Sequence, residues 1–597
     1  MFFLLLFITN PIFAQLSSGQ INTALQRASQ LESQKDYAGA IGIYRQLYNQ
    51  FPKRIDILMR FESALSRAGL HADAIELLYK RLAVTPNDIG SRLRIGQAFF
   101  ALGQPDSAVA HWNHILQKAT NANSFALVAD RYRKQNLDKQ AAQTYRQART
   151  TLKDSTLFAR ELAEIAERQT RHPEAVREYL RYIQKAPQYR PMVEARLRDF
   201  AQNGDQHTEV FELLSTHVRT GDSKYLGLLI EYGLPAGFAS QTLDLLLSVD
   251  PPPANAWMHL SRIARYELDS NNPITAISAY RALHDGIERP DLRARAQLGL
   301  GRANELARRP NDAQNHYNVL IKHYANRPEA DEARFRLGII LRDHQNDSAG
   351  AQKAFHSLIN TKRRNIWRYN AFFELAEGYI QTNSPDAAKL AWQQIITERT
   401  SAPEGAKARF KLAEFRFLSG HIQSAQGLLD TLLQSNTNRD IVNDAIALSV
   451  LLQEGQRADS TALKTYAHTQ LLLRQHKTEA AFTALEKLYN DDTQSFFADR
   501  LLNHIAQIHT QYKRYAQAIQ TYRKLISTIS WSPLCPAAQM AQANIYNTHL
   551  KQYYDAQKAY EVLLIDYPLS LESDIARERL RTLQRKIQDL ESKREAG

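Results

Sequence analysis

The stretch KDYAGAIGIYRQLYNQFPKR, residues 35–54, places a small residue, a large aromatic residue and a proline at fixed intervals, at Ala40, Tyr44 and Pro52. The stretch HADAIELLYKRLAVTP, residues 71–86, repeats the alanine and the proline 34 residues later, at Ala74 and Pro86. Residues four apart share one face of a helix. Proline cannot continue a helix, so it marks the following turn. The two stretches therefore predict two copies of one helical unit.

The same register continues along the chain. In the first part, alanines stand 33 or 34 residues apart, and a large residue follows each after four positions: Ala40/Tyr44, Ala74/Leu78, Ala108/Trp112, Ala141/Tyr145 and Ala175/Tyr179. Farther on the interval is mostly 37 or 38 residues, at Ala276, Ala313, Ala351, Ala388, Ala425, Ala480, Ala518 and Ala556. Two divergent units, at 207–214 and 240–247, are expected between the two series. We predict about fifteen units.

This pattern resembles the tetratricopeptide repeat, a 34-residue helix-turn-helix with Leu-Gly-x-x-Tyr in its first helix and Ala-x-x-x-Phe followed by proline in its second. The resemblance implies an all-α fold, a right-handed α-solenoid or superhelix of about fifteen such units. A C-terminal capping helix is expected to end the stack. Its apolar residues Leu580, Leu583, Ile587 and Leu590 would alternatively suit a short coiled-coil contact with a partner.

The repeat spacing and its interruptions predict the domain organisation. We expect a signal peptide (1–14), a block with a 34-residue period (15–189), divergent units and a proline joint (190–255), a block with a period of about 37 residues (256–434), an irregular helical insert (435–465), a C-terminal block (466–570) and the capping helix (571–597).

The N-terminus, MFFLLLFITNPIFAQ, is typical of a secretory signal. Its apolar run from Phe2 to Ile8 is too short to span a bilayer as a helix. We expect cleavage after Ala14 and a periplasmic or otherwise exported protein without a transmembrane segment. No cysteine follows the run, so a lipoprotein is not expected. Because no Lys or Arg precedes the run, a cytoplasmic adaptor with a misread start remains the alternative.

Charge and cysteine content argue against a nucleic-acid partner and against an intrachain disulfide. The net charge of +13 comes from 75 basic and 62 acidic residues interspersed along the chain, so a nucleic-acid partner is not expected. Cys535 is the single cysteine, so no intrachain disulfide can form. It is expected in a proline-flanked loop as a partly buried small residue, with an intermolecular disulfide as the alternative.

The sequence contains no recognisable catalytic motif. HExxH, GxSxG, GxxxxGK[ST], a paired CxxC and a calcium loop are all absent. GLGRAN at 299–304 begins like a dinucleotide fingerprint but lacks the third glycine and falls within a repeat helix. His111 and His114 offer only two metal ligands and are expected at the surface. We expect no enzyme, no cofactor and no metal.

The most unusual local stretch is TKRRNIWRYN, residues 361–370. It sets Lys362, Arg363, Arg364 and Arg368 around Trp367 at the start of a helix. Cations at this end of a helix oppose its dipole, so helix stability does not explain them. The hypothesis is a patch for an anionic partner, and the alternative is a solvated connector.

The resemblance implies a non-catalytic scaffold that binds protein or peptide partners on its superhelical groove, here in the bacterial cell envelope. Some relatives hold peptide carboxylates with Lys and Asn on successive first helices; the corresponding positions include Leu25, Ser29 and Arg60, so that set is missing. The chain is similar in motif to secreted Tol-Pal coordinators and outer-membrane assembly components. An alternative is an accessory or regulatory subunit of a peptidoglycan or outer-membrane assembly machine.

Overall fold

A computed structural model describes residues 17–220, 223–361, 363–434 and 439–595. These residues are helical almost throughout and include no β-strand, which confirms the expected all-α fold. The predicted signal peptide, residues 1–14, and Lys362 of the basic stretch lie outside the described residues.

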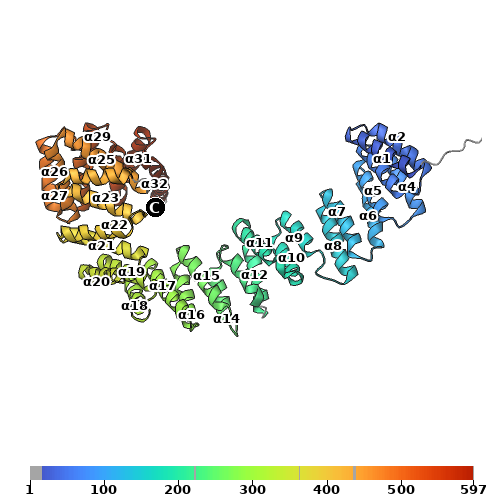
Figure 1. Cartoon of the computed structure of the whole chain (residues 1–597), viewed down its shortest axis with the longest axis horizontal. Helices are drawn as coiled ribbons and strands as arrows, with labels where there is room; N and C mark the ends of the chain where they lie inside the picture. The colour runs from blue at the N-terminus through green and yellow to red at the C-terminus, as the bar shows by residue number, and fades with distance from the viewer. Residues whose placement is uncertain (1–16, 221–222, 362, 435–438, 596–597) are drawn as a thin grey trace, which may run out of the picture. The chain divides into compact units, whose positions relative to one another are not determined.

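The chain divides into two compact units, Met1–Tyr266 (unit 1) and Glu267–Gly597 (unit 2). Unit 1 consists of consecutive helices that pack against their neighbours (Figure 1). Its helices are α1 (Ser18–Ser33), α2 (Tyr37–Gln50), α3 (Ile55–Arg67), α4 (His71–Val84), α5 (Ile89–Ala101), α6 (Pro105–Gln117), α7 (Ala122–Lys134), α8 (Asp138–Leu152), α9 (Ala159–Arg168), α10 (His172–Lys185), α11 (Arg190–Asn203), α12 (His207–Arg219), α13 (Leu226–Gly233) and α14 (Ala239–Ser248), with short 3₁₀ turns at Pro187–Tyr189 and Ser223–Tyr225.

Helix α15 (Ala256–Asp269) contains the boundary between the units. Unit 2 continues with α16 (Pro273–Asp285), α17 (Pro290–Leu306), α18 (Pro310–His323), α19 (Pro328–Gln345), α20 (Ser348–Ile359), α21 (Ile366–Gln381), α22 (Pro385–Glu398), α23 (Pro403–Leu418), α24 (Ile422–Gln434), α25 (Arg439–Ala458), α26 (Ser460–Arg474), α27 (Thr478–Asp491), α28 (Ala498–Gln511), α29 (Tyr515–Thr528), α30 (Cys535–Asn544) with a π-helical turn (Ile545–Leu550), α31 (Tyr553–Asp566) and α32 (Leu571–Glu595). In chain order, all the described α-helices except α25 and α32 can be grouped into fifteen consecutive pairs.

The alanines of the repeat are the buried packing positions of the second helix in each pair. From Ala40 to Ala556, the predicted alanines are at most 3% exposed, except Ala480. Ala480 is exposed and its neighbour Ala481 is buried, so that prediction was wrong by one residue. In the divergent α12 and α14, Val210 and Thr242 occupy the position.

A left-handed residue reverses the chain between the helices of fourteen of the fifteen pairs. It lies five positions before the buried position of the second helix, as in Lys35 (φ 65°) and Gly69 (φ 77°). A left-handed residue just after a helix turns the chain sharply, so that the N–H groups that follow can bind the last carbonyl groups of the helix. The exception is the turn between α11 and α12, where Gly204 is extended at φ −86° and ψ 171°.

Glycines in the first helices make room for the large residues of the second. A Cβ on Gly96 of α5 would lie 2.2 Å from Nε1 of Trp112, a fully buried side chain of α6 that donates to the Leu93 carbonyl over 3.2 Å. A Cβ on Gly301 would likewise lie 2.2 Å from the ring of Tyr317. The glycines of GLGRAN are therefore helix-packing residues.

Two features near the C-terminus modify the repeat. Cys535 is the first residue of α30, and it is fully buried. The expected loop was wrong because Pro536, next to it, favours the first turn of a helix. Helix α32 packs against α31 and α30 through Ala576, Leu583 and Ile587, while Leu590 is 46% exposed.

Candidate interaction surface

Arginine–glutamate ion pairs connect the first helices of successive pairs. In unit 1, Arg94 of α5 donates to Glu62 of α3 over 2.6 Å. Farther on, Arg198 of α11 reaches Glu231 of α13 over 2.7 Å, and Arg262 of α15 binds the same carboxylate. In unit 2, Arg302 and Glu332 pair over 2.5 Å. We call this series the ladder; it gives the first helices a charged face.

Some rungs of the ladder also include a tyrosine of the second helix. The Tyr44 hydroxyl donates to Glu32 over 2.7 Å, and Arg67 of α3 binds the other carboxylate oxygen over 3.0 Å. The same arrangement joins Tyr179, Glu167 and Arg196, and again Tyr317, Glu305 and Arg336. Each triad therefore links both helices of one pair to the next pair.

The charged face of the first helices is hollowed in unit 1 by a cleft of about 410 Å³. Helices α3, α5 and α7 supply most of its lining, and His71 at the start of α4 completes it. Three arginines, Arg67, Arg94 and Arg131, line the cleft, together with one carboxylate, that of Glu62. Within the described residues, the cleft is thus richer in cationic than in anionic side chains. A cleft of this kind suits an anionic group.

Sequence comparison connects these helix pairs with a known family. Two family models, both described as tetratricopeptide repeat, match residues 23–54 and residues 128–190. The matches cover α1–α2 and α8–α10, and they fall on the register of buried Ala40, Ala141 and Ala175. The chain contains tetratricopeptide repeats. Proteins built from these repeats are typically non-catalytic scaffolds for protein–protein interaction.

Several solved structures are similar to this chain at low sequence identity. A tetratricopeptide repeat protein from Parabacteroides merdae is 12% identical, with a TM-score of 0.28, over 45% of this chain and 92% of that chain. Yeast Tom70 is 13% identical, with a TM-score of 0.26, over 90% of this chain and 99% of that chain. The Cut9–Hcn1 hetero-tetramer of the APC/C is 12% identical, with a TM-score of 0.23, over 95% of this chain and 96% of that chain. No curated protein matches the chain.

Contacts between helix pairs explain the basic stretch at 361–370. Arg363 donates to Asp331 of α19 over 2.7 and 2.8 Å and to the Asn326 carbonyl over 2.6 Å. Arg368 is buried and forms a bidentate pair with Glu398 of α22. These cations therefore stabilise contacts between repeats, an explanation that the local sequence did not reveal.

Two other members of the stretch differ in their surroundings. Trp367 is half-buried, with its ring centroid 5.5 Å from that of Phe335. Arg364 is exposed and, among the described residues, forms no ion pair. Among the described cations of the predicted patch, Arg364 is thus the one most available to an anionic partner. The Arg368 guanidinium holds the pKa of Glu398 down at about 2.

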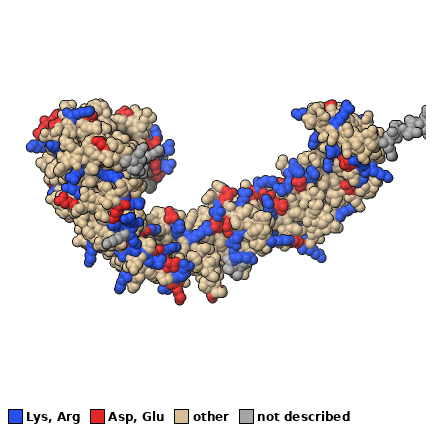
Figure 2. Space-filling model, in the orientation of Figure 1, with Lys and Arg blue, Asp and Glu red and all other residues tan. Residues whose placement is uncertain are grey.

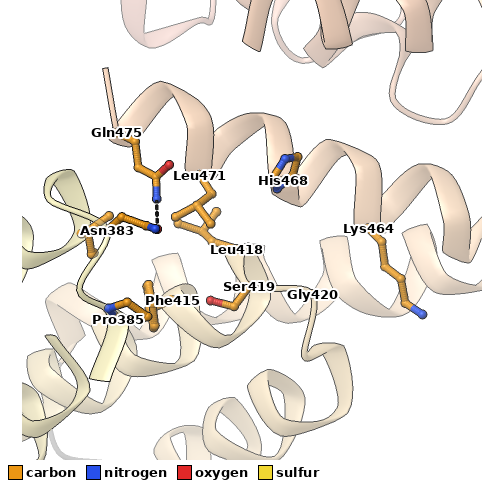
Figure 3. A pocket seen from close by; sticks show the side chains of 11 residues that line it. Asn383, Pro385, Phe415, Leu418, Ser419, Gly420, Lys464, His468, Leu471 and Gln475 are labelled. Carbon is orange, nitrogen blue, oxygen red and sulfur yellow. Dashed lines mark hydrogen bonds between the residues drawn. The ribbon is translucent and has the colours of Figure 1, made fainter. Parts of the chain in front are cut away.

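A second cleft, of about 280 Å³, lies in unit 2 where α26 packs against α23 (Figure 3). Its wall includes the apolar Phe415, Leu418 and Leu471, while Lys464 and His468 stand on α26. Gln475 donates to Asn383 over 3.2 Å, across 92 positions of sequence. Both α26 and α25, the helix that stands outside the helix pairs, contact α23.

The remaining surface is of mixed charge. Figure 2 shows basic and acidic side chains interspersed over the visible face, without a continuous basic stripe. In the part of the chain that the structure describes, no three metal-ligating side chains gather into a group, and no helix combines the length and the apolar character needed to cross a membrane. His111, expected at the surface, is half-buried between Tyr79 and Phe99.

The ladder and the first cleft were not anticipated from the sequence. A signal for the triads is nevertheless present, because a glutamate precedes Tyr44, Tyr179 and Tyr317 by twelve positions in each case. The arginine partners stand 29 to 35 positions after the same glutamates. Such spacing could have identified the first-helix face.

Proposed function

We propose that the chain is a non-catalytic scaffold of the bacterial cell envelope that binds partner proteins on the face formed by its first helices. The cleft across α3, α5 and α7 carries this proposal, because three successive repeats contribute to one hollow lined by arginines. A stack of repeats buries each unit against its neighbours and leaves one long composite surface for binding. The tetratricopeptide repeats support the scaffold class.

The partner-binding part of the proposal is tested by crosslinking in intact cells. Complexes of the full chain are fixed, purified through a tag and identified, with a matched strain that lacks the tag as control. We expect the same few proteins to be enriched in every replicate. Recovery of only those proteins that the untagged control also yields would contradict the scaffold function.

Export to the envelope is a separate part of the proposal, supported by the apolar run from Phe2 to Ile8 and by the small Ala14. N-terminal sequencing of the protein purified from its native cells tests it. We expect the mature chain to begin at Gln15. A chain that retains Met1 would contradict export and favour a cytoplasmic scaffold, without affecting the proposal of partner binding.

A further inference from the structure

Arg131 interrupts the ladder. Its neighbours in unit 1, such as Arg94 and Arg133, each donate to a glutamate on an adjacent first helix. Arg131 of α7 instead donates to the neutral amide oxygen of Gln97 over 3.1 Å. Among the described residues it has no carboxylate partner, and its Nε is buried without an acceptor. A buried donor without an acceptor costs free energy, so this site is able to take a further acceptor.

The surroundings of Arg131 do not supply that anion. The 410 Å³ cleft that it lines contains the carboxylate of Glu62, which is already engaged by Arg94 over 2.6 Å and by Ser66 over 2.9 Å. The Nδ1 atom of His71, also in the lining, is buried and unpartnered. Two nitrogens of the lining residues therefore have no partner within the chain, while both oxygens of the one carboxylate already accept a hydrogen bond.

We infer that this cleft binds a carboxylate group of a partner polypeptide, which takes the place of the missing glutamate beside Arg131. A guanidinium presents two parallel donors that match a carboxylate. The hollow is within the usual size of ligand pockets, about 300–1,000 Å³, so it accepts an acidic side chain with its flanking backbone. The inference rests on the proposed scaffold function and names the chemistry of its partner.

The same lining favours a carboxylate over a phosphate. Arg94 and Arg67 are already paired with Glu62 and Glu32, which leaves one cation of the lining, Arg131, to match a monoanion. The other rungs of the ladder are also built from carboxylates. The positions involved differ from Leu25, Ser29 and Arg60, where some relatives hold peptide carboxylates, so the cleft constitutes a separate set of residues.

The experiment measures binding of short labelled peptides to the full chain. The probe is a fluorescein-labelled peptide of about twelve residues of Gly, Ser and Glu, compared with one that has Gln for Glu and one that has phosphoserine for Glu. Fluorescence polarisation at low salt follows binding, since exposed charge pairs are weakened by ions. We expect the Glu peptide to bind at least tenfold more tightly than the Gln peptide and more tightly than the phosphoserine peptide.

Two variants test the role of Arg131 in opposite ways. Arg131→Gln removes the guanidinium with its two parallel donors, and it is expected to abolish the preference for the Glu peptide over the Gln peptide. Gln97→Glu supplies the missing carboxylate from within the chain, so it is expected to abolish the same preference while keeping or raising the melting temperature. Arg177→Gln, at an exposed arginine of α10, is the control that should leave binding unchanged.

Equal binding of the Glu and Gln peptides, preference for the phosphoserine peptide, or wild-type binding by Arg131→Gln would each overturn the inference. An unchanged or raised melting temperature of Gln97→Glu separates loss of binding in that variant from loss of fold. If Arg131→Gln still captures the partners recovered by crosslinking in cells, the scaffold function stands and the carboxylate site does not.

Discussion

The Tyr44 hydroxyl lies 2.7 Å from a carboxylate oxygen of Glu32, twelve residues earlier in the same helix pair. Glu32 also binds Arg67 of the next pair over 3.0 Å. Burial and this carboxylate together raise the pKa of Tyr44 to about 12, so its hydroxyl stays protonated and donates at physiological pH. One carboxylate thus holds a repeat together and connects it to its neighbour.

The triad formed by Tyr179, Glu167 and Arg196 predicts unequal effects of two substitutions. Tyr179→Phe removes one hydrogen bond and is expected to cost about 1 kcal/mol, while Glu167→Gln removes the charge that serves both partners and is expected to cost about 2 kcal/mol. Chemical denaturation followed by circular dichroism measures both. A larger loss for Tyr179→Phe than for Glu167→Gln would contradict the shared role of the carboxylate.

Gly96 and Gly42 predict opposite effects of the same substitution. Gly96→Ala places a methyl group 2.2 Å from the Trp112 indole, and overpacking of this kind is expected to cost about 1–3 kcal/mol. Gly42 lies in α2 with no heavy atom within 4 Å of a built Cβ, so Gly42→Ala is expected to stabilise by about 0.5–1 kcal/mol. The thermal unfolding midpoints of the two variants should therefore shift in opposite directions. A destabilising Gly42→Ala would contradict the open space found around Gly42.

Arg363 and Arg364 are adjacent but differ in environment. Arg363→Ala leaves the fully buried Asp331 with fewer partners and is expected to cost about 2–4 kcal/mol. Arg364→Ala at the exposed position is expected to change stability by less than about 0.5 kcal/mol. Denaturation midpoints check both values.

Arg364 also permits a test of the anionic-partner hypothesis, because its replacement spares the fold. Arg364→Glu is expected to reduce the recovery of an anionic partner after crosslinking in cells. Unchanged recovery of every partner would contradict a binding role for this arginine.

The pair of Arg368 and Glu398 predicts a pH dependence of stability. The pKa of Glu398 is lowered from 4.5 to about 2 in the folded protein, first by its hydrogen bond with Arg368. The contribution of the pair is therefore fully present above about pH 4.5 and is lost as the pH falls towards 2. The difference in unfolding free energy between the wild-type chain and Glu398→Gln should be largest at neutral pH and should vanish near pH 2. A difference that does not depend on pH would contradict this assignment.

The sequence period was sufficient to predict the packing core of the fold. Ala40, Tyr44 and their counterparts recur because helix crossings need a small residue beside a large one, and these positions are read directly from spacing. At residues 480–481 two alanines stand together, so spacing alone could not decide which one is buried. The packing of α26 against α23 was also not predictable, because the two helices are not consecutive and the unpaired α25 lies between them in the chain.

The candidate site was less accessible from the sequence than the core. The arginines at 363 and 368 attracted attention as a local cluster, yet their partners Asp331 and Glu398 lie about 30 residues away, in other repeats. Conversely, Arg131 has an unremarkable local context, and its missing partner becomes visible only beside complete rungs such as Arg94 with Glu62. Recognition depends on residues that vary between repeats, so the period does not reveal it.

The most direct test of the scaffold proposal compares the two helix layers of one repeat. A photo-crosslinking residue, benzoylphenylalanine, is placed in intact cells at Ala101 of α5, which lines the cleft, or at Ala110 of α6, an exposed alanine of the second helix. We predict crosslinked partners from position 101 and few or none from position 110. Partners captured from position 110 alone, or equally from both positions, would contradict binding on the first-helix face.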